Sequence, residues 1–186
     1  MRILIACEYS GRVREAFRAL GHDAISCDLL PTEQPGPHHV GDCLELAYSG
    51  EFDLMVCHPP CTDLAVSGAR HFAAKRADGR QQAALDFVRK LLDAPVPRIA
   101  LENPVSIISS HIRPASQYIE PWQHGHGETK KTGLWLKGLP LLQPSNVVEG
   151  RADTVNKMPP GPDRWKNRSR TYQGVANAMA QQWGNA

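Results

Sequence analysis

Short apolar runs alternate with amphipathic helical segments along the first hundred residues, and this alternation is the feature that most constrains the fold. The apolar runs have strand length and cover residues 2–7, 24–27, 53–57 and 98–101. Helical spacing follows the first run, with Val13, Phe17 and Leu20 on one face, and recurs over residues 80–92. Strands that alternate with helices predict a mostly parallel, helix-covered sheet, which is an α/β fold.

The pattern changes after residue 119, where polar and proline-rich stretches interrupt the periodicity. Residues 133–136 are still predicted to form a short strand. We see no internal repeat and no domain boundary, so we predict a single domain over residues 1–186. Its parts are a core over residues 1–140, a polar basic loop over 143–170 and a C-terminal helix over 171–184.

Composition and cysteine use favour a cytoplasmic protein. Hydrophobic residues make up 41% and charged residues 22%, as in ordinary globular chains. The first apolar run meets Glu8 too early for a signal peptide, and no run is long enough to span a membrane. Three of the five cysteines lie in or beside apolar runs, which favours reduced thiols over a disulfide framework. Two prolines between Cys57 and Cys61 argue against a closed zinc site, so we expect no metal.

Charge is unevenly distributed, although the formal net charge is only +2. Residues 70–80 carry a net +3 and residues 151–170 a net +4, which leaves the rest of the chain acidic. Two basic segments on an acidic body indicate either a polyanionic partner or two solvated loops. Charge alone does not decide between them.

An acidic residue, a glycine or a cysteine follows each predicted strand up to residue 101, including a short one at residues 39–40. Ligands of open parallel sheets bind beyond the carboxyl ends of the strands, so these positions are the candidate site. They are residues 8–11, Asp28, residues 41–42, residues 58–61 and residues 102–104.

The first three of these positions suit a cofactor. Residues 8–11 contain a single glycine, but a turn into a helix N-terminus can offer free backbone amides to a ligand, and a plain strand–helix turn is the alternative. Asp28 ends the second strand, where an acidic residue commonly accepts hydrogen bonds from ribose hydroxyls. Asp42 could contact a ligand or cap the next helix, and both remain open.

Cys61 and Glu102 form the candidate catalytic pair. Two prolines precede Cys61 and restrict the backbone, which aims its side chain, and Glu102 follows a neighbouring strand. A thiolate nucleophile and a carboxyl group that exchanges a proton make a plausible catalytic pair. The alternatives are a buried loop thiol for Cys61 and a helix N-cap for Glu102.

Taken together, these residues resemble the cytosine-C5 DNA methyltransferases, particularly the small phage and prophage members that lack a full target-recognition domain. Pro60-Cys61 resembles the Pro-Cys nucleophile motif of the family, and Glu102-Asn103 its Glu-Asn motif. Gly41-Asp42 resembles the Gly-Asp pair that precedes the catalytic strand. The cofactor loop of the family resembles residues 6–11, and the acidic residue at the end of its second strand resembles Asp28. The C-terminal helix of the family, which packs back beside the cofactor, resembles residues 174–178.

The resemblance implies a Rossmann-like methyltransferase fold, with a mostly parallel sheet and helices on both faces. It also implies transfer of a methyl group from S-adenosylmethionine to cytosine C5 in DNA, through a covalent bond between Cys61 and C6 assisted by Glu102. The resemblance also implies that the target cytosine is flipped out or single-stranded. It further implies that the protein acts in the cytoplasm, which is the cytoplasm of the host cell if a phage encodes the protein.

The resemblance further implies two sets of binding residues. The cofactor set is Ala6, Cys7, Glu8, Tyr9, Ser10, Gly11, Asp28, Asp42, Pro59 and Asn177. The DNA set is Pro60, Asn103, Arg70, Lys75, Arg76, Lys130, Lys131, Arg168 and Arg170.

The chain departs from the family at several positions, and these departures keep other functions open. The cofactor loop lacks the glycine-rich Phe-x-Gly-x-Gly form, Thr62 replaces a glutamine and Pro104 replaces a valine. The chain also has little room for a target-recognition domain. A related enzyme that transfers another group to C5, or acts on a free pyrimidine nucleotide, is one alternative. A non-catalytic module that binds nucleotides or DNA is another.

Overall fold

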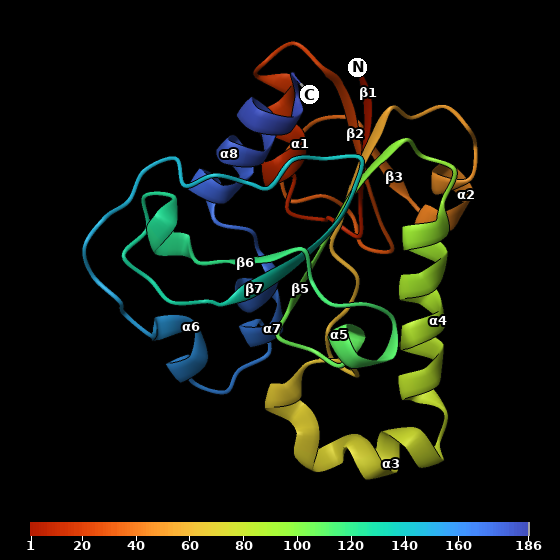
Figure 1. The fold of residues 1–186 in the computed structure, drawn as a ribbon, viewed down its shortest axis with the longest axis vertical. Helices are drawn as coiled ribbons and strands as arrows, with labels where there is room; N and C mark the ends of the chain where they lie inside the picture. The colour runs from red at the N-terminus through yellow and green to blue at the C-terminus, as the bar shows by residue number, and fades with distance from the viewer. Residues whose placement is uncertain (186) are drawn as a thin grey trace.

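The computed structural model describes residues 1–185, apart from the side chain of Asn156, and its centre is a seven-stranded sheet (Figure 1). The strands are β1 (Arg2–Ala6), β2 (Asp23–Asp28), β3 (His38–Val40), β4 (Leu54–Cys57), β5 (Arg98–Pro104), β6 (Gln117–Ile119) and β7 (Thr132–Lys137). The α-helices are α1 (Arg12–Arg18), α2 (Cys43–Ala47), α3 (Phe72–Ala77), α4 (Arg80–Asp93), α5 (Ile108–His111), α6 (Thr154–Lys157), α7 (Arg164–Ser169) and α8 (Gln173–Trp183). Two 3-10 helices are η1 (Val66–His71) and η2 (Pro121–Gln123).

The strand order β3-β2-β1-β4-β5-β7-β6 confirms the prediction of a mostly parallel sheet. Strands β3, β2, β1, β4 and β5 are parallel to one another, whereas β7 is antiparallel to both β5 and β6. The chain leaves β1 toward β2 and β3 on one side and returns to β4 on the other. The carboxyl ends of β1 and β4 therefore flank a topological switch point, where α/β sheets bind ligands.

Helices cover both faces of the sheet, as the α/β prediction requires (Figure 1). On one face, α1 and α8 pack Phe17, Met179 and Trp183 against strand residues such as Ile5 and Val56. On the other face, α2 and α4 cover the alternate strand positions. The residues of that second core include Leu4, Met55, Leu85, Val88, Leu91 and Leu101. The C-terminal helix α8 packs back on this core through Val175, Met179 and Trp183.

Two segments differ from the prediction by more than a residue at an end. The fourth apolar run was expected to stop before Glu102, but β5 continues to Pro104 because β7 pairs with it as far as Thr132. The parallel partner β4 has already ended opposite Leu101, so the missing amide of Pro104 costs no ladder hydrogen bond on that side. The segment 143–170, expected to be a loop, contains the short helices α6 and α7.

The described part of the chain contains no helix that combines the length and apolarity needed to cross a bilayer.

Candidate active site

A cavity lies at the switch point, beyond the carboxyl ends of β1, β4 and β5. It collects side chains from five separate segments of the chain. Its lining residues are Cys7, Glu8, Tyr9, Ser10, His58, Pro59, Pro60, Cys61, Glu102, Asn103, Pro104, Lys130, Arg168, Ser169, Arg170 and Thr171. Both members of the predicted catalytic pair, Cys61 and Glu102, therefore face the same space.

Glu102 is a largely buried carboxylate in the cavity. Its side chain is only 14% exposed, and His58 Nδ1 lies 3.2 Å from its Oε2. Burial raises the pKa of Glu102, but hydrogen bonds from His58 and Thr132 and the charge of Lys130 outweigh burial, so that the pKa is lowered. Glu102 is therefore ionised at neutral pH and acts as a hydrogen-bond acceptor.

Cys61 is held in the protonated thiol form in the free protein. Burial raises its pKa, and the Glu102 carboxylate adds to this effect, whereas Lys130 and Arg168 act in the opposite direction. Because the thiolate is the nucleophile, Cys61 needs a change in its surroundings before it can react. Binding of a ligand group that neutralises Glu102 is one such change.

Glu8 binds two backbone amides that the predicted cofactor loop was expected to offer to a ligand. Its carboxylate accepts hydrogen bonds from the amides of Val13, at 2.8 Å, and Arg14, at 3.2 Å, and from Ser10 Oγ at 3.0 Å. The loop was expected to offer free amides at the N-terminus of α1. These two amides are instead bound by Glu8, because a carboxylate placed one turn before the helix caps it directly.

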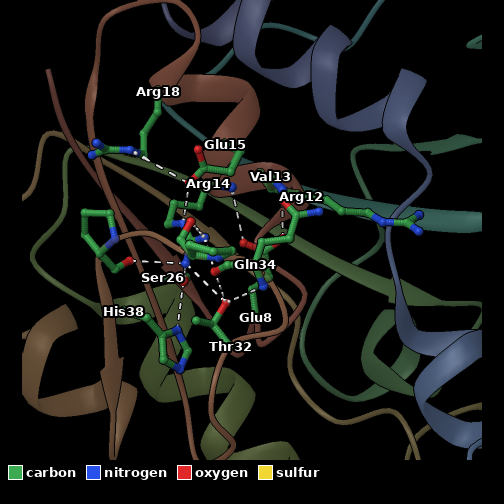
Figure 2. A network of polar contacts seen from close by, with 12 residues as sticks. Glu8, Arg12, Val13, Arg14, Glu15, Arg18, Ser26, Thr32, Gln34 and His38 are labelled. Atoms are coloured by element: carbon green, nitrogen blue, oxygen red, sulfur yellow. Dashed lines mark hydrogen bonds and ion pairs between the residues drawn. The ribbon is translucent and has the colours of Figure 1, made fainter.

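A buried arginine fixes the loop after β2 against α1 (Figure 2). Arg14 is fully buried and donates to Ser26 Oγ at 2.9 Å and to the Gln34 carbonyl at 2.8 Å, among six acceptors. Glu33 lies in the same loop and makes a bidentate ion pair with Arg170, at 2.6 and 2.8 Å. Arg14 thus acts through this loop on the segment that closes the cavity.

The segment from α7 to the start of α8, which we call the closing segment, contributes residues 168–171 to the lining of the cavity. Tyr9 Oη donates to the Lys166 carbonyl at 2.8 Å and lies 2.8 Å from Ser169 Oγ, and Arg12 donates to the Thr171 carbonyl at 3.0 Å. The cavity holds about 110 Å³, which is less than small-molecule sites usually provide.

Five predicted cofactor residues lie outside the cavity. Ala6 is buried at the end of β1, and Gly11 begins α1 with a φ of +74°. Asp28 Oδ1 accepts from the Leu30 amide at 3.0 Å, and Asp42 caps α2 through the Leu44 amide. Asn177 is exposed on α8. Capping is thus the observed contact of Asp42, and a cofactor role for these five residues stays a prediction.

The predicted DNA-binding residues separate into two groups. Lys130, Arg168 and Arg170 line the cavity together with Pro60 and Asn103. The other four lie elsewhere, and they are Arg70, Lys75, Arg76 and Lys131.

Lys75 is not available to bind a phosphate, so the prediction for this residue of the 70–80 segment was wrong. Its side chain is only 9% exposed, and its ammonium group pairs with Asp63 Oδ1 at 3.2 Å and donates to the Thr62 carbonyl. A phosphate cannot reach an ammonium group in this position. Arg70 and Arg76 are exposed and remain available to a polyanion.

His58 is the site residue that sequence reasoning missed. Its Nδ1 contacts Glu102, and its Nε2 is buried with no hydrogen-bond partner. An unsatisfied buried acceptor costs about 1–3 kcal/mol, so it calls for an explanation. Its position between the end of β4 and Pro59-Pro60 is the sequence feature that could have identified it. His58 also lies near Cys57 and Cys61, and this cluster suggested a metal ligand instead. The described residues contain no group of three or more potential ligands that could hold a metal ion.

Comparisons with known proteins bear on the fold. No protein-family model matches the chain, and no curated protein matches it. Among solved structures, the chain is similar to a protein described as a candidate DNA modification methyltransferase encoded within a prophage of E. coli, with a TM-score of 0.51 and 12% identity. The match covers 88% of this chain and 56% of the other, so the chain spans little more than half of that protein's length. The predicted methyltransferase-like α/β fold is thus confirmed at the level of architecture.

Proposed function

We propose that this protein is an S-adenosylmethionine-dependent methyltransferase that modifies C5 of cytosine in DNA. The observation that carries the proposal is the shared cavity of Cys61 and Glu102 at the switch point of the sheet. The fold agrees with it, since the similar solved structure is described as a candidate DNA modification methyltransferase.

The residues of the cavity suit this cofactor better than a phosphate-bearing one. Glu8 occupies two amides at the N-terminus of α1, and its negative charge there disfavours a pyrophosphate group. Carboxylates at Glu8 and Glu102 instead favour a cation, and S-adenosylmethionine carries a sulfonium and an ammonium group but no phosphate. Residues 7–10 and Pro59 would hold it, with Asp28 beyond the second strand as the candidate ribose acceptor. When bound, S-adenosylmethionine supplies an electrophilic methyl group.

Cys61 and Glu102 supply the activation that cytosine needs. Cytosine C5 is a poor nucleophile, but addition of the Cys61 thiolate to C6 pushes the ring electrons toward C5. Glu102 accepts a hydrogen bond from the exocyclic amine. N3 is itself an acceptor in neutral cytosine, so it bonds to Glu102 only once it takes up the proton that the Cys61 thiol releases, and this neutralises the charge that develops on the ring. Loss of the C5 proton and cleavage of the C6–S bond then restore the aromatic ring and return Cys61 as a thiolate.

The raised pKa of the Cys61 thiol gives a reason why the reactivity of Cys61 would depend on a bound substrate. In the free protein, Glu102 disfavours a second negative charge on Cys61. A base that donates hydrogen bonds to Glu102 disperses that charge, and the thiolate then forms more readily beside Lys130 and Arg168. The thiol is therefore unreactive until a base arrives.

Cationic and aromatic side chains at the mouth of the cavity support DNA as the substrate. Arg168 and Lys130 can bind phosphates, and Trp165 on α7 is 53% exposed with its ring centre 6.1 Å from that of Tyr9. An exposed aromatic ring beside cations is typical of surfaces on which unpaired bases stack. The target base must leave the helical stack, or be unpaired already, to reach Cys61.

Transfer of a labelled methyl group from S-adenosylmethionine tests the proposal directly. Purified protein is offered single-stranded DNA, duplex DNA and dCTP, with Cys61→Ala as the inactive variant and Cys27→Ala, a buried thiol on β2, as its matched control. We expect label in cytosine of DNA with the unmodified protein and Cys27→Ala only. Label in dCTP alone would instead indicate a nucleotide-modifying enzyme, and no label on any substrate would contradict the proposal.

A further inference from the structure

Helix α7 places an exposed indole beside the cavity. Trp165 is 53% exposed, and its ring centre lies 6.1 Å from that of Tyr9, which lines the cavity. Tyr9 Oη donates to the Lys166 carbonyl at 2.8 Å and so holds α7 in this place. Arg168 follows Trp165 by one helical turn and itself lines the cavity. The indole is therefore within reach of the nucleotides next to a base that occupies the cavity.

Trp165 differs from the other tryptophans of the chain in its surroundings. Trp135 and Trp183 are fully buried in the two cores, and the guanidinium group of Arg151 lies 3.9 Å from the centre of the Trp122 ring. Single exposed apolar side chains are common on protein surfaces, so exposure alone indicates no ligand. The position of Trp165, beside a cavity and within a cluster of cations, is what indicates one.

The cations around this indole suit the phosphates of a nucleic acid. Residues 164–170 contain four cationic side chains and no acidic one. Glu33 neutralises Arg170, but Lys166 Nζ lies 5.6 Å from the centre of the indole ring and Arg168 lines the cavity. Proteins that bind single strands combine these two elements, an aromatic ring on which a base stacks and cations that follow the backbone.

We propose that the substrate is single-stranded DNA and that Trp165 stacks an unpaired base next to the target, while Lys166 and Arg168 bind the phosphates beside it. The inference rests on the proposed function for the place of the target base, at Cys61. In a duplex, flipping releases only the target base, and its neighbours stay paired and stacked, out of reach of the indole. In a single strand every base is free to stack on an aromatic ring. The indole therefore favours the single strand.

Fluorescence anisotropy of a labelled oligothymidylate measures this preference without methyl transfer, because the strand contains no cytosine. The strand is offered alone and paired with oligoadenylate, and we expect the protein to bind the single strand more tightly. Trp165→Ala should weaken binding of the single strand by roughly fivefold to 150-fold, the loss of one stacked base, and leave binding of the duplex unchanged. A duplex that is bound more tightly, an equal loss for both forms, or no loss for either would overturn the inference.

Two further variants separate stacking from folding and from charge. Trp165→Phe keeps an aromatic face and should retain most of the affinity for the single strand. Tyr48→Ala, the matched control, removes a ring that is 49% exposed directly after α2 and should change neither affinity. The loss in Trp165→Ala should persist as salt rises, because salt weakens phosphate contacts rather than stacking. A loss in Trp165→Phe as large as that in Trp165→Ala, or a loss that disappears with salt, would overturn the inference.

These outcomes are distinct from failure of the proposed function. If the protein transfers no methyl group to DNA, but the preference for the single strand depends on Trp165, then the binding surface stands and methylation fails. If methyl transfer to DNA occurs while binding of the single strand is insensitive to Trp165, the reverse holds.

Discussion

Replacing Glu102 by glutamine should make Cys61 more reactive in the free protein, although it should abolish the proposed reaction. The substitution keeps the shape of the side chain and removes the negative charge that raises the pKa of the Cys61 thiol. Two unit charges about 4 Å apart interact by about 4 kcal/mol at an effective dielectric constant of about 20, and the interaction weakens in inverse proportion to their distance. Lys130 and Arg168 offset part of the Glu102 effect, so the expected change is a lower pKa of the Cys61 thiol and a larger thiolate fraction at neutral pH.

The assay is the rate of alkylation of Cys61 by iodoacetamide, followed at neutral pH by mass spectrometry of the peptide that contains Cys61. Only Cys61 and Cys7 among the five cysteines are partly exposed, so the peptide measurement separates the two. Glu45→Gln, which removes an exposed carboxylate on α2, is the matched control and should leave the rate unchanged. A slower or unchanged rate in Glu102→Gln would refute the reasoning, because burial alone would then account for the unreactive thiol.

Three further outcomes follow from the packing around the site. Arg14→Leu leaves buried acceptors unpaired and should therefore destabilise the fold by about 3–5 kcal/mol. This corresponds to a fall in Tm of roughly 6–20 °C, and a fall of less than about 3 °C would contradict the prediction. Gly174→Ala should destabilise strongly or prevent folding, since its Cβ would lie 1.7 Å from the His124 carbonyl oxygen; a native Tm would show that α8 is placed differently. Glu33→Gln should increase hydrogen exchange in the closing segment, by weakening the ion pair with Arg170 by about 1 kcal/mol. The hydrogen bond from Arg170 lowers the pKa of Glu33 in the folded protein. The stabilisation by this ion pair is therefore complete above the pKa of Glu33 in the unfolded chain, about 4.3, and is lost as the pH falls through the lower pKa of the folded state. Hydrogen exchange in the closing segment that does not change with acid would argue against this prediction.

The sheet was predictable because its signals are local. Apolar runs of the length of residues 53–57 are typical of buried strands, and the alternation with helices favours a parallel arrangement. The extension of β5 through Glu102 to Pro104 was not predictable in the same way, because it depends on β7, a partner 30 residues further along the chain. Strand ends are set by pairing, which a single run does not contain.

The site was predictable only in part, for a similar reason. Cys61 and Glu102 were identified because strand ends meet at one edge of a parallel sheet, a rule that needs no side-chain detail. His58 and Glu33 were missed because their roles depend on which atoms face each other across the fold. Lys75 was assigned to phosphate because sequence shows charge, whereas only the structure shows that Asp63 takes that charge.

Mass spectrometry of nucleosides from DNA of cells that express the protein tests the central claim most directly, beside cells that express Cys61→Ala. The proposal predicts 5-methylcytosine in the first sample and none in the second, because addition of Cys61 to C6 is what activates C5. Unmodified cytosine in both samples, or 5-methylcytosine that persists without Cys61, would contradict it.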